Sequence, residues 1–586
     1  MLSVIGIWIY ILLTAFLTGY GIMRVATRRI PYRVRHFDSY LICGFAGVTV
    51  YAQLFSLLGR VGLAANLGLC ILCMASAWHG RQELGRMVQE TWNGIRTNQL
   101  RERGKMFTAL FLFLLFAYGT SRGIIHYDTG LYHAQSIRWI EEYGVVRGLG
   151  NLHCRLAYNS SSFALSALYS MAFLGGQSFH CVAGFLAFLL AKVSVEAASQ
   201  LRGKRLRASG FARVMCGYYL VNIFDEMVSP ASDYFMVLIA FYIVIRFLDL
   251  LESGVAETFP YAMLCVLGVF LMTVKLSAAL ILLLVCYPAF DLLRGRRWKE
   301  TGVYLVLGIV TALPFFVRNV VLSGWLVYPF TQINLFDVAW KIPKGMADYD
   351  AREIQVWGRG YRDVSGYDIP MGEWIGDWFR SLAGSDKLLV AASGLAVCIL
   401  LVYSIGMLCR LWESRWGILL VQITVAASFL FWLCTSPLIR YGCVYVYLAP
   451  AVVFGGIYDA VLGAMEVRAE RKSGKRQDDA GRQEIHKKNV VQEAVKLCGV
   501  LPVYFLVGYK CAAFGGEIAG SFVNDYWVVQ KDYENYPVHS YEIDGVTFYY
   551  PVEGDQVGYE AFPSSPVQAE VELMGEGVKD GFLSGL

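Results

Sequence analysis

The sequence predicts an all-α polytopic membrane protein with about 13–14 transmembrane helices and a small C-terminal segment that contains some β structure. Of its 586 residues, 56% are hydrophobic and only 17% are charged, whereas a soluble chain has about a quarter charged residues. Apolar stretches of roughly 17 to 25 residues, long enough to cross a bilayer as helices, recur along most of the chain. Only helices satisfy their backbone groups within one segment in lipid, so these stretches predict a helical bundle.

The first apolar stretch, "MLSVIGIWIYILLTAFLTGYGIM", has no basic residue before it. A cleavable signal peptide begins with a basic region, so we expect this stretch to be a retained first span. The candidate spans are about 2–23, 37–58, 61–79, 107–122, 178–200, 213–229, 234–251, 259–275, 276–293, 302–320, 387–409, 416–435, 442–464 and 490–513.

The basic residues between the spans predict the topology. Lys and Arg cluster in loops on the cytoplasmic side of membrane proteins, and threading the spans between the clusters places both termini outside. The apolar segment 161–175 is short and rich in serine, so we expect it to be a half-buried or juxtamembrane helix. If it crossed the membrane, every later basic cluster would lie on the outer side. The basic clusters are 24–35, 81–105, 202–213, 294–299 and 468–488.

This topology divides the chain into five parts. We expect N-terminal transmembrane helices at 1–106, a core at 107–320 with a first outer loop at 123–177, a large outer loop at 321–386, C-terminal transmembrane helices at 387–513 and an outer tail at 514–586. In the tail, "YEIDGVTFYYP" places Asp544-Gly545 between two runs rich in β-branched and aromatic residues. That pattern predicts a β-hairpin with a type I′ turn.

The polar clusters beside the membrane all fall on the predicted outer face, which favours an active site or a permeation vestibule there. In "IIHYDTGLYH", Asp128 is either an N-cap of an interfacial helix or a general base. His126 and His133 are then candidates for binding substrate or phosphate. Two histidines and an acid are also possible ligands of a divalent metal, but their spacing matches no metal motif. We therefore predict no definite cofactor and keep a metal at Asp128 open.

Several further residues at the predicted outer ends of spans are candidates for holding a phosphate. A lysine or arginine at such depth indicates function, although snorkelling is the alternative for each, and arginine binds phosphate oxygens bidentately. The short turn "FDEMVSPASDY" is either an ordinary turn or a second acidic element. The phosphate candidates are His153, Arg155, Lys275, Arg318, Asn319 and Arg440, and the second acidic element is Asp225, Glu226 and Asp233.

Charge and cysteine content argue against a nucleic-acid-binding protein and against a protein stabilised by zinc or disulfides. The net charge of +5 is spread over short clusters between spans, so we expect the lipid bilayer, and no nucleic acid, as a partner. Nearly all of the 14 cysteines lie in apolar runs, where a thiol behaves as a small hydrophobic group. Neither a zinc site nor a disulfide framework is indicated.

The order of these features is similar to the plan of the GT-C class of membrane glycosyltransferases, which use polyprenyl-phosphate-linked sugar donors. The blocks "HYDTGLYHAQSIRWIEEYGVVRGLGNLHCRLAYNSS", "VRNVVLSGWLVYP" and "SPLIRYG" resemble those of a large uncharacterised family of bacterial membrane proteins regarded as glycosyltransferase-like. The resemblance covers most of the chain. It implies that Asp128 is the acidic residue of the first outer loop, which acts on the acceptor or helps to hold a metal. Many GT-C enzymes have paired acids there, whereas Asp128 has Tyr127 and Thr129 beside it.

The expected function is therefore transfer of a sugar from a polyprenyl-phosphate-linked donor to a glycan, lipid or protein acceptor, outside the bacterial cytoplasmic membrane, in surface glycan assembly. Two alternatives remain open. A surface polysaccharide polymerase or ligase would also use a large outer loop such as 321–386. A transporter of lipid-linked glycans would need charges within spans and repeated halves. Lys192 and Glu196 are the main such charges, and no internal repeat is evident.

Overall fold

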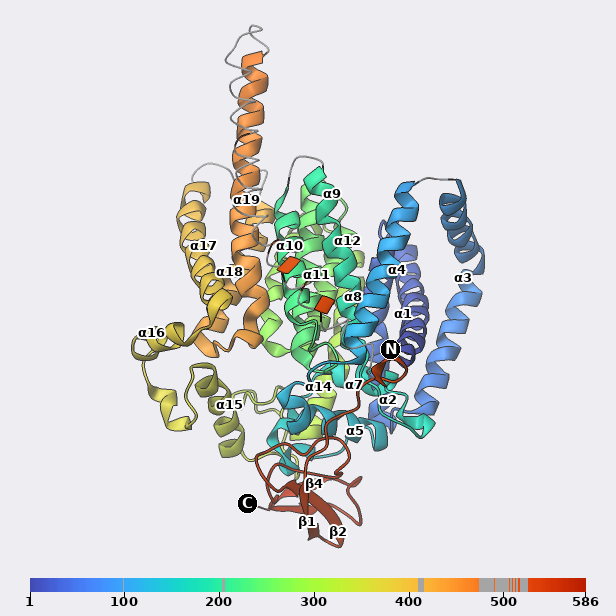
Figure 1. Ribbon diagram of the computed structural model, residues 1–586, viewed down its shortest axis with the longest axis vertical. Coiled ribbons are helices and arrows are strands. Elements are labelled where there is room, and N and C mark those ends of the chain that lie inside the picture. The colour runs from blue at the N-terminus through green and yellow to red at the C-terminus, as the bar shows by residue number, and fades with distance from the viewer. Residues whose placement is uncertain are drawn as a thin grey trace.

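The computed structural model is a bundle of long helices capped at one end by loops and short strands (Figure 1). It describes residues 1–97, 100–202, 206–408, 416–473 and 525–585, and a few single positions between 474 and 524. Within that part of the chain, ten helices are long and apolar enough to cross a membrane, so this is a multi-pass membrane protein. They are α1 (Leu2–Arg29), α2 (Phe37–Leu58), α3 (Leu63–Thr97), α4 (Leu100–Ser121), α11 (Ser232–Glu252), η4 (Leu276–Val285) continuing into α13 (Cys286–Arg294), α14 (Trp298–Ser323), α17 (Gly384–Leu408), α18 (Trp416–Thr435) and α19 (Ile439–Ser473).

Two expected spans are shorter helices than the sequence suggested, α8 (Val182–Val195) and α10 (Ala208–Asn222), with 14 and 15 residues. The expected span 259–275 is the helix α12 (Thr258–Val274), which has the expected 17 residues. Nearly every residue of α8 is buried, and a helix surrounded by protein need not match the thickness of the lipid. The last expected span, 490–513, lies outside the residues that the structure describes.

The ambiguous segment 161–175 forms the short helix α7 (Ser161–Tyr169). Its nine residues rise about 14 Å, roughly half of the hydrocarbon thickness, so α7 is too short to cross. Ser160 caps it by accepting a hydrogen bond from the amide of Ser162. All nine residues are buried, so α7 belongs to the protein core and is not an interfacial helix.

The two ends of the bundle differ in charge, as the topology prediction requires. Figure 1 shows the junction of α3 and α4, the short helix α9 (Ala197–Arg202) and the far end of α19 at the top, and these carry basic clusters of the sequence. The first loop, the 321–386 loop and the tail lie at the bottom. This segregation agrees with loops on opposite sides of a membrane.

Short elements build the loop-bearing end. In the first loop and its surroundings these are η1 (Thr129–His133), α5 (Ala134–Glu142), α6 (Leu149–Leu152), η2 (Cys154–Ala157) and η3 (Ala172–Leu174). In the large loop they are α15 (Lys344–Gly358), η5 (Val364–Asp368) and α16 (Met371–Ser381), and the tail begins with η8 (Asp525–Trp527).

The tail contains the predicted hairpin. Strand β1 (Val538–Ile543) pairs antiparallel with β2 (Val546–Pro551). Asp544 and Gly545 have φ of 51° and 80°, and a type I′ turn needs positive φ at both central residues. The hairpin prediction is therefore confirmed. A second pair, β3 (Val571–Leu573) with β4 (Phe582–Ser584), completes the tail.

Candidate functional site

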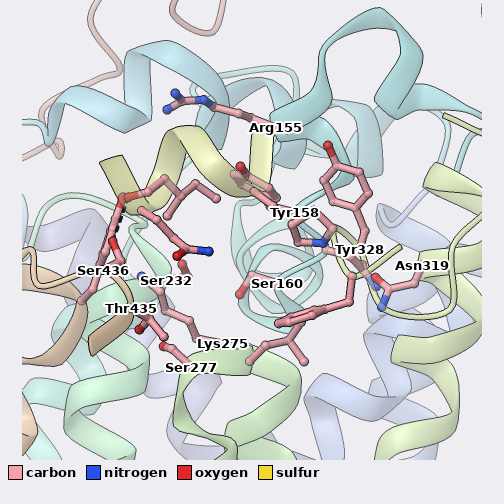
Figure 2. A pocket seen from close by; sticks show the side chains of 18 of the residues that line it. Arg155, Tyr158, Ser160, Ser232, Lys275, Ser277, Asn319, Tyr328, Thr435 and Ser436 are labelled. Carbon is pink, nitrogen blue, oxygen red and sulfur yellow. Dashed lines mark hydrogen bonds between the residues drawn. The ribbon is translucent and has the colours of Figure 1, made fainter. Parts of the chain in front are cut away.

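A cavity of about 610 Å³ lies at the loop-bearing end, between the helical bundle and the large loop. Figure 2 shows Lys275, Ser277 and Thr435 along its lower wall and Arg155 at the top. Its lining combines charged side chains with aromatic and aliphatic ones. Five predicted site residues line it: Asp128, Arg155, Asp233, Lys275 and Asn319.

Asp128 lies at the start of η1 with its side chain directed to Arg440. The Asp128 Oδ2 and Arg440 Nη2 atoms are 2.9 Å apart, and the carboxylate is almost fully buried. Within the described residues its side chain makes no capping hydrogen bond to the helix that follows. The geometry therefore excludes the simple N-cap interpretation and gives Asp128 an ion-pair partner on α19, more than 300 positions away in the chain.

His126 completes this arrangement through Arg440. Burial lowers the pKa of His126, so its imidazole is neutral near pH 7 and has one bare nitrogen. Arg440 Nη1 lies 2.8 Å from His126 Nε2, and the backbone amide of Asp128 lies 3.2 Å from His126 Nδ1. Both groups only donate, so they compete for the one bare nitrogen, and the guanidinium makes the shorter contact. Arg440 is thus held by a carboxylate and an imidazole, and it orients Asp128.

Lys275 occupies the break between α12 and η4. Its backbone is extended, with φ −153° and ψ 121°, so the helix ends where the ammonium enters the cavity. Lys275 forms an ion pair with Asp233 at the start of α11, and its Nζ lies 4.2 Å from the ring centroid of Tyr441. The ten-residue 3-10 helix that follows is unusually long for its type.

The large loop supplies the side of the cavity that faces away from the bundle. Arg155 reaches Glu353 of α15 at 3.3 Å, and its guanidinium lies 4.9 Å from the ring centroid of Trp357. The buried Asp350 accepts hydrogen bonds from Tyr158 at 2.6 Å and Tyr328 at 3.0 Å. These contacts tie the large loop to the first loop.

Sequence reasoning missed the contribution of the large loop to the lining. Tyr328, Lys344, Arg352 and Trp357 all line the cavity. The only signal in the sequence is that this predicted outer loop contains several Trp and Tyr residues, which does not indicate that the loop covers a cavity.

Five predicted substrate or phosphate ligands are outside the lining of the cavity. The described residues that line it do not include His126, His133, His153, Arg318 or Arg440. Arg318 is buried and donates to Asn159 Oδ1 at 2.8 Å and to Ser56. His133 is fully buried between Tyr132 and Phe163. Both side chains therefore support the wall of the cavity from behind.

The predicted second acidic element is divided. Asp233 faces the cavity, whereas Asp225 lies 3.4 Å from Arg122 and Glu226 accepts a hydrogen bond from Tyr234. Among the described residues, no group of three or more His, Cys, Asp and Glu side chains is arranged to hold a metal ion. Asp225 and Glu226 therefore shape the turn, and only Asp233 can meet a ligand.

The tail holds the loop that carries Asp128. The carbonyl oxygen of Gly130 accepts hydrogen bonds from the amides of Val557 and Gly558, each at 2.9 Å. Gln556 Nε2 donates to the carbonyl of Tyr127 at 2.9 Å. A Cβ on Gly130 would lie 2.9 Å from both Gln556 and Tyr536, so glycine permits this close contact.

A family model for a domain of unknown function, DUF8201, matches residues 1–447. The chain belongs to this family. The match includes every residue that lines the cavity, whereas the tail that holds Asp128 in place lies beyond it. No curated protein and no solved structure matches the chain.

Protonation of His133 is expected to make the site region sensitive to acid. Burial keeps the pKa of His133 well below its usual value near 6.5, and its Nε2 has no hydrogen-bond partner within the described residues. Below pH 6.5 the unfolded chain binds the proton and the folded chain does not, so the free energy of unfolding falls by about 1.4 kcal/mol per pH unit until the lowered pKa is reached.

The measurement is the unfolding temperature of the detergent-purified chain at pH 7 and pH 5. Phenylalanine at this position cannot be protonated and keeps most of the ring packing. We therefore expect His133→Phe to lose less stability than the wild type over this interval. Equal losses in both proteins would show that His133 does not titrate as described.

Proposed function

We propose that the protein is a membrane glycosyltransferase that uses a polyprenyl-phosphate-linked sugar as donor. Its site faces the outside of a bacterial cytoplasmic membrane, and it acts in surface glycan assembly. The observation that carries the proposal is that the wall of one cavity contains both a carboxylate, Asp128, and a lysine, Lys275. A sugar transferase needs these two functions: a base for the acceptor and a cation for the departing phosphate.

The charges of the cavity suit a phosphate-bearing donor. Four lining residues are cationic, namely Arg155, Lys275, Lys344 and Arg352, and three are acidic, namely Asp128, Asp233 and Asp348. Lys275 is paired with Asp233, so a phosphate would compete with that carboxylate for the ammonium.

The apolar part of the lining suits a lipid carrier. The cavity is lined from the long apolar helices by Leu276 of η4, Phe315 of α14, and Phe431 and Trp432 of α18. Phe431 is also partly exposed on the outside of the bundle. A polyprenyl chain would lie in the bilayer beside these helices while its phosphate reaches Lys275.

The chemistry is a single displacement. Asp128 accepts the proton of an acceptor hydroxyl while that oxygen attacks the anomeric carbon of the sugar. The bond between the anomeric carbon and the phosphate oxygen breaks, and its electron pair leaves with the polyprenyl phosphate. Lys275 stabilises this anion, and the configuration at the sugar is inverted.

Release of the lipid phosphate distinguishes sugar transfer from transport. The purified chain, given a polyprenyl-phosphate sugar with a labelled sugar and a mixture of glycan acceptors, is expected to transfer the label and release the polyprenyl phosphate. A transporter would move the intact donor across a vesicle membrane without breaking it. Intact donor after prolonged incubation with every acceptor would overturn the proposal.

The ion pairs of Glu196 argue against a transport pathway through the bundle. Glu196 lies 2.9 Å from Arg213 and 3.1 Å from Arg246, and both arginines also contact Asp249. A permeation path needs charges that exchange partners with its substrate. These charges instead pair with one another.

A further inference from the structure

A second cavity, of about 390 Å³, lies between α1, α2, α11, α12 and α14. It starts at the loop before α2 and follows that helix from His36 to Leu54. Eighteen residues of helix rise about 27 Å, so the cavity is a groove comparable in length to the hydrocarbon core of a bilayer. It shares no lining residue with the first cavity.

The wall of the groove is apolar along most of its length. Representative lining residues are Ile42, Ala46, Val50, Leu264 and Leu267. The groove also reaches the lipid-facing surface, because its lining residues Leu54 and Val310 are 47% and 50% exposed. An apolar chain can therefore enter from the side, and in a membrane protein the surrounding apolar chains are those of lipids.

One end of the groove is basic. The nine positions from 28 to 36 contain Arg28, Arg29, Arg33, Arg35 and His36, all exposed, and no acidic residue. Arg35 and His36 line the groove itself. Arg35 also lies 3.2 Å from Glu257, but both side chains are half exposed, and such a pair is weak.

Arg246, deeper in the groove, is already neutralised. It lies 2.9 Å from Asp38 and 3.0 Å from Asp249, so it has little charge to offer a ligand. The attraction for an anion therefore comes from the loop at positions 28–36. This end carries the basic clusters of the sequence, and anionic lipids attract such juxtamembrane segments.

We propose that this groove binds an anionic glycerophospholipid. One acyl chain lies along α2, and the phosphate contacts Arg35 and His36. A guanidinium donates two parallel hydrogen bonds to phosphate oxygens, and the imidazole supplies another. This lipid site is separate from the proposed transferase site, and the proposal does not depend on the reaction proposed there.

Native mass spectrometry of the full, delipidated chain tests the proposal with two probes. Phosphatidylglycerol and phosphatidylcholine with identical acyl chains are titrated separately. We expect phosphatidylglycerol to bind at least about fivefold more tightly, the contribution of one basic residue near an anionic headgroup. Equal affinities for the two lipids would overturn the proposal.

Two matched pairs of variants locate the binding. Val310→Trp fills the groove and is expected to reduce phosphatidylglycerol binding, whereas Leu305→Trp, at a 61% exposed position of the same helix outside the groove, is not. Arg35→Gln with His36→Gln should abolish the preference for phosphatidylglycerol. His79→Gln with Arg81→Gln, at exposed positions of α3, should keep it. If a variant and its control changed phosphatidylglycerol binding equally, the assignment of the lipid to this groove would be overturned.

Discussion

Asp128→Asn is expected to slow sugar transfer by about 10²- to 10⁴-fold, the usual contribution of a general base. The amide keeps the size of the side chain and can still accept a hydrogen bond from Arg440, which lies 2.9 Å from the carboxylate. It cannot take up the proton of the acceptor hydroxyl. The measurement is the initial rate of label transfer from a polyprenyl-phosphate sugar at equal amounts of purified protein.

The control for this variant is Asp377→Asn. Asp377 lies on α16 and is 77% exposed, in an ion pair with Arg380, so its replacement removes the same charge far from the wall of the cavity. We expect normal transfer by Asp377→Asn. Normal transfer by Asp128→Asn would show that Asp128 is not the base. Failure of Asp128→Asn to run as a single species in gel filtration would instead assign the residue a structural role.

Arg246→Met is expected to lower the free energy of unfolding by about 3–5 kcal/mol, because removing one partner of a buried ion pair leaves the others uncompensated. Arg246 is buried within 2.9 to 3.1 Å of Asp38, Glu196 and Asp249. Methionine fills a similar volume, so the loss comes from the carboxylates: Glu196 and Asp249 keep only their contacts with Arg213 among the arginines of this network. Asp38 keeps the hydrogen bond from Tyr242 but loses its arginine. The unfolding temperature of the detergent-purified chain measures the effect.

Arg380→Met is the matched comparison, because Arg380 is also paired with an acid but is 77% exposed. An exposed pair contributes about 0–1 kcal/mol, so we expect little change in its unfolding temperature. If the two variants have the same unfolding temperature, the ion pairs of Arg246 are exposed to water in the folded protein. The charges of those pairs would then be accessible to a substrate, which would support the transport alternative.

The sequence predicted the helical class and many of the element positions because both depend on local patterns. Length and hydropathy identify a span without reference to its neighbours, as for α2 and α14. The turn at Asp544-Gly545 also follows from local chemistry, since few residues adopt positive φ in succession. Prediction was less accurate for α8, whose length depends on being surrounded by protein.

The site was predictable only in part. The sequence placed Asp128, Asp233 and Lys275 on one face, and the structure brings them to one cavity. It did not show that Arg318 points to Asn159 and Ser56 or that His133 is buried. Which side of a helix faces a cavity depends on how the helices pack, and one sequence contains no direct record of that packing.

By itself, the sequence determined that the chain crosses a membrane repeatedly, that its basic loops segregate from its unusual polar residues, and that the tail contains a hairpin. These properties follow from transfer of apolar segments into lipid and from local backbone preferences. Only the tertiary structure decided that Asp128 pairs with Arg440 and Lys275 with Asp233. Such pairs join residues 312 and 42 positions apart, and distant side chains meet only where the packing of the whole bundle places them.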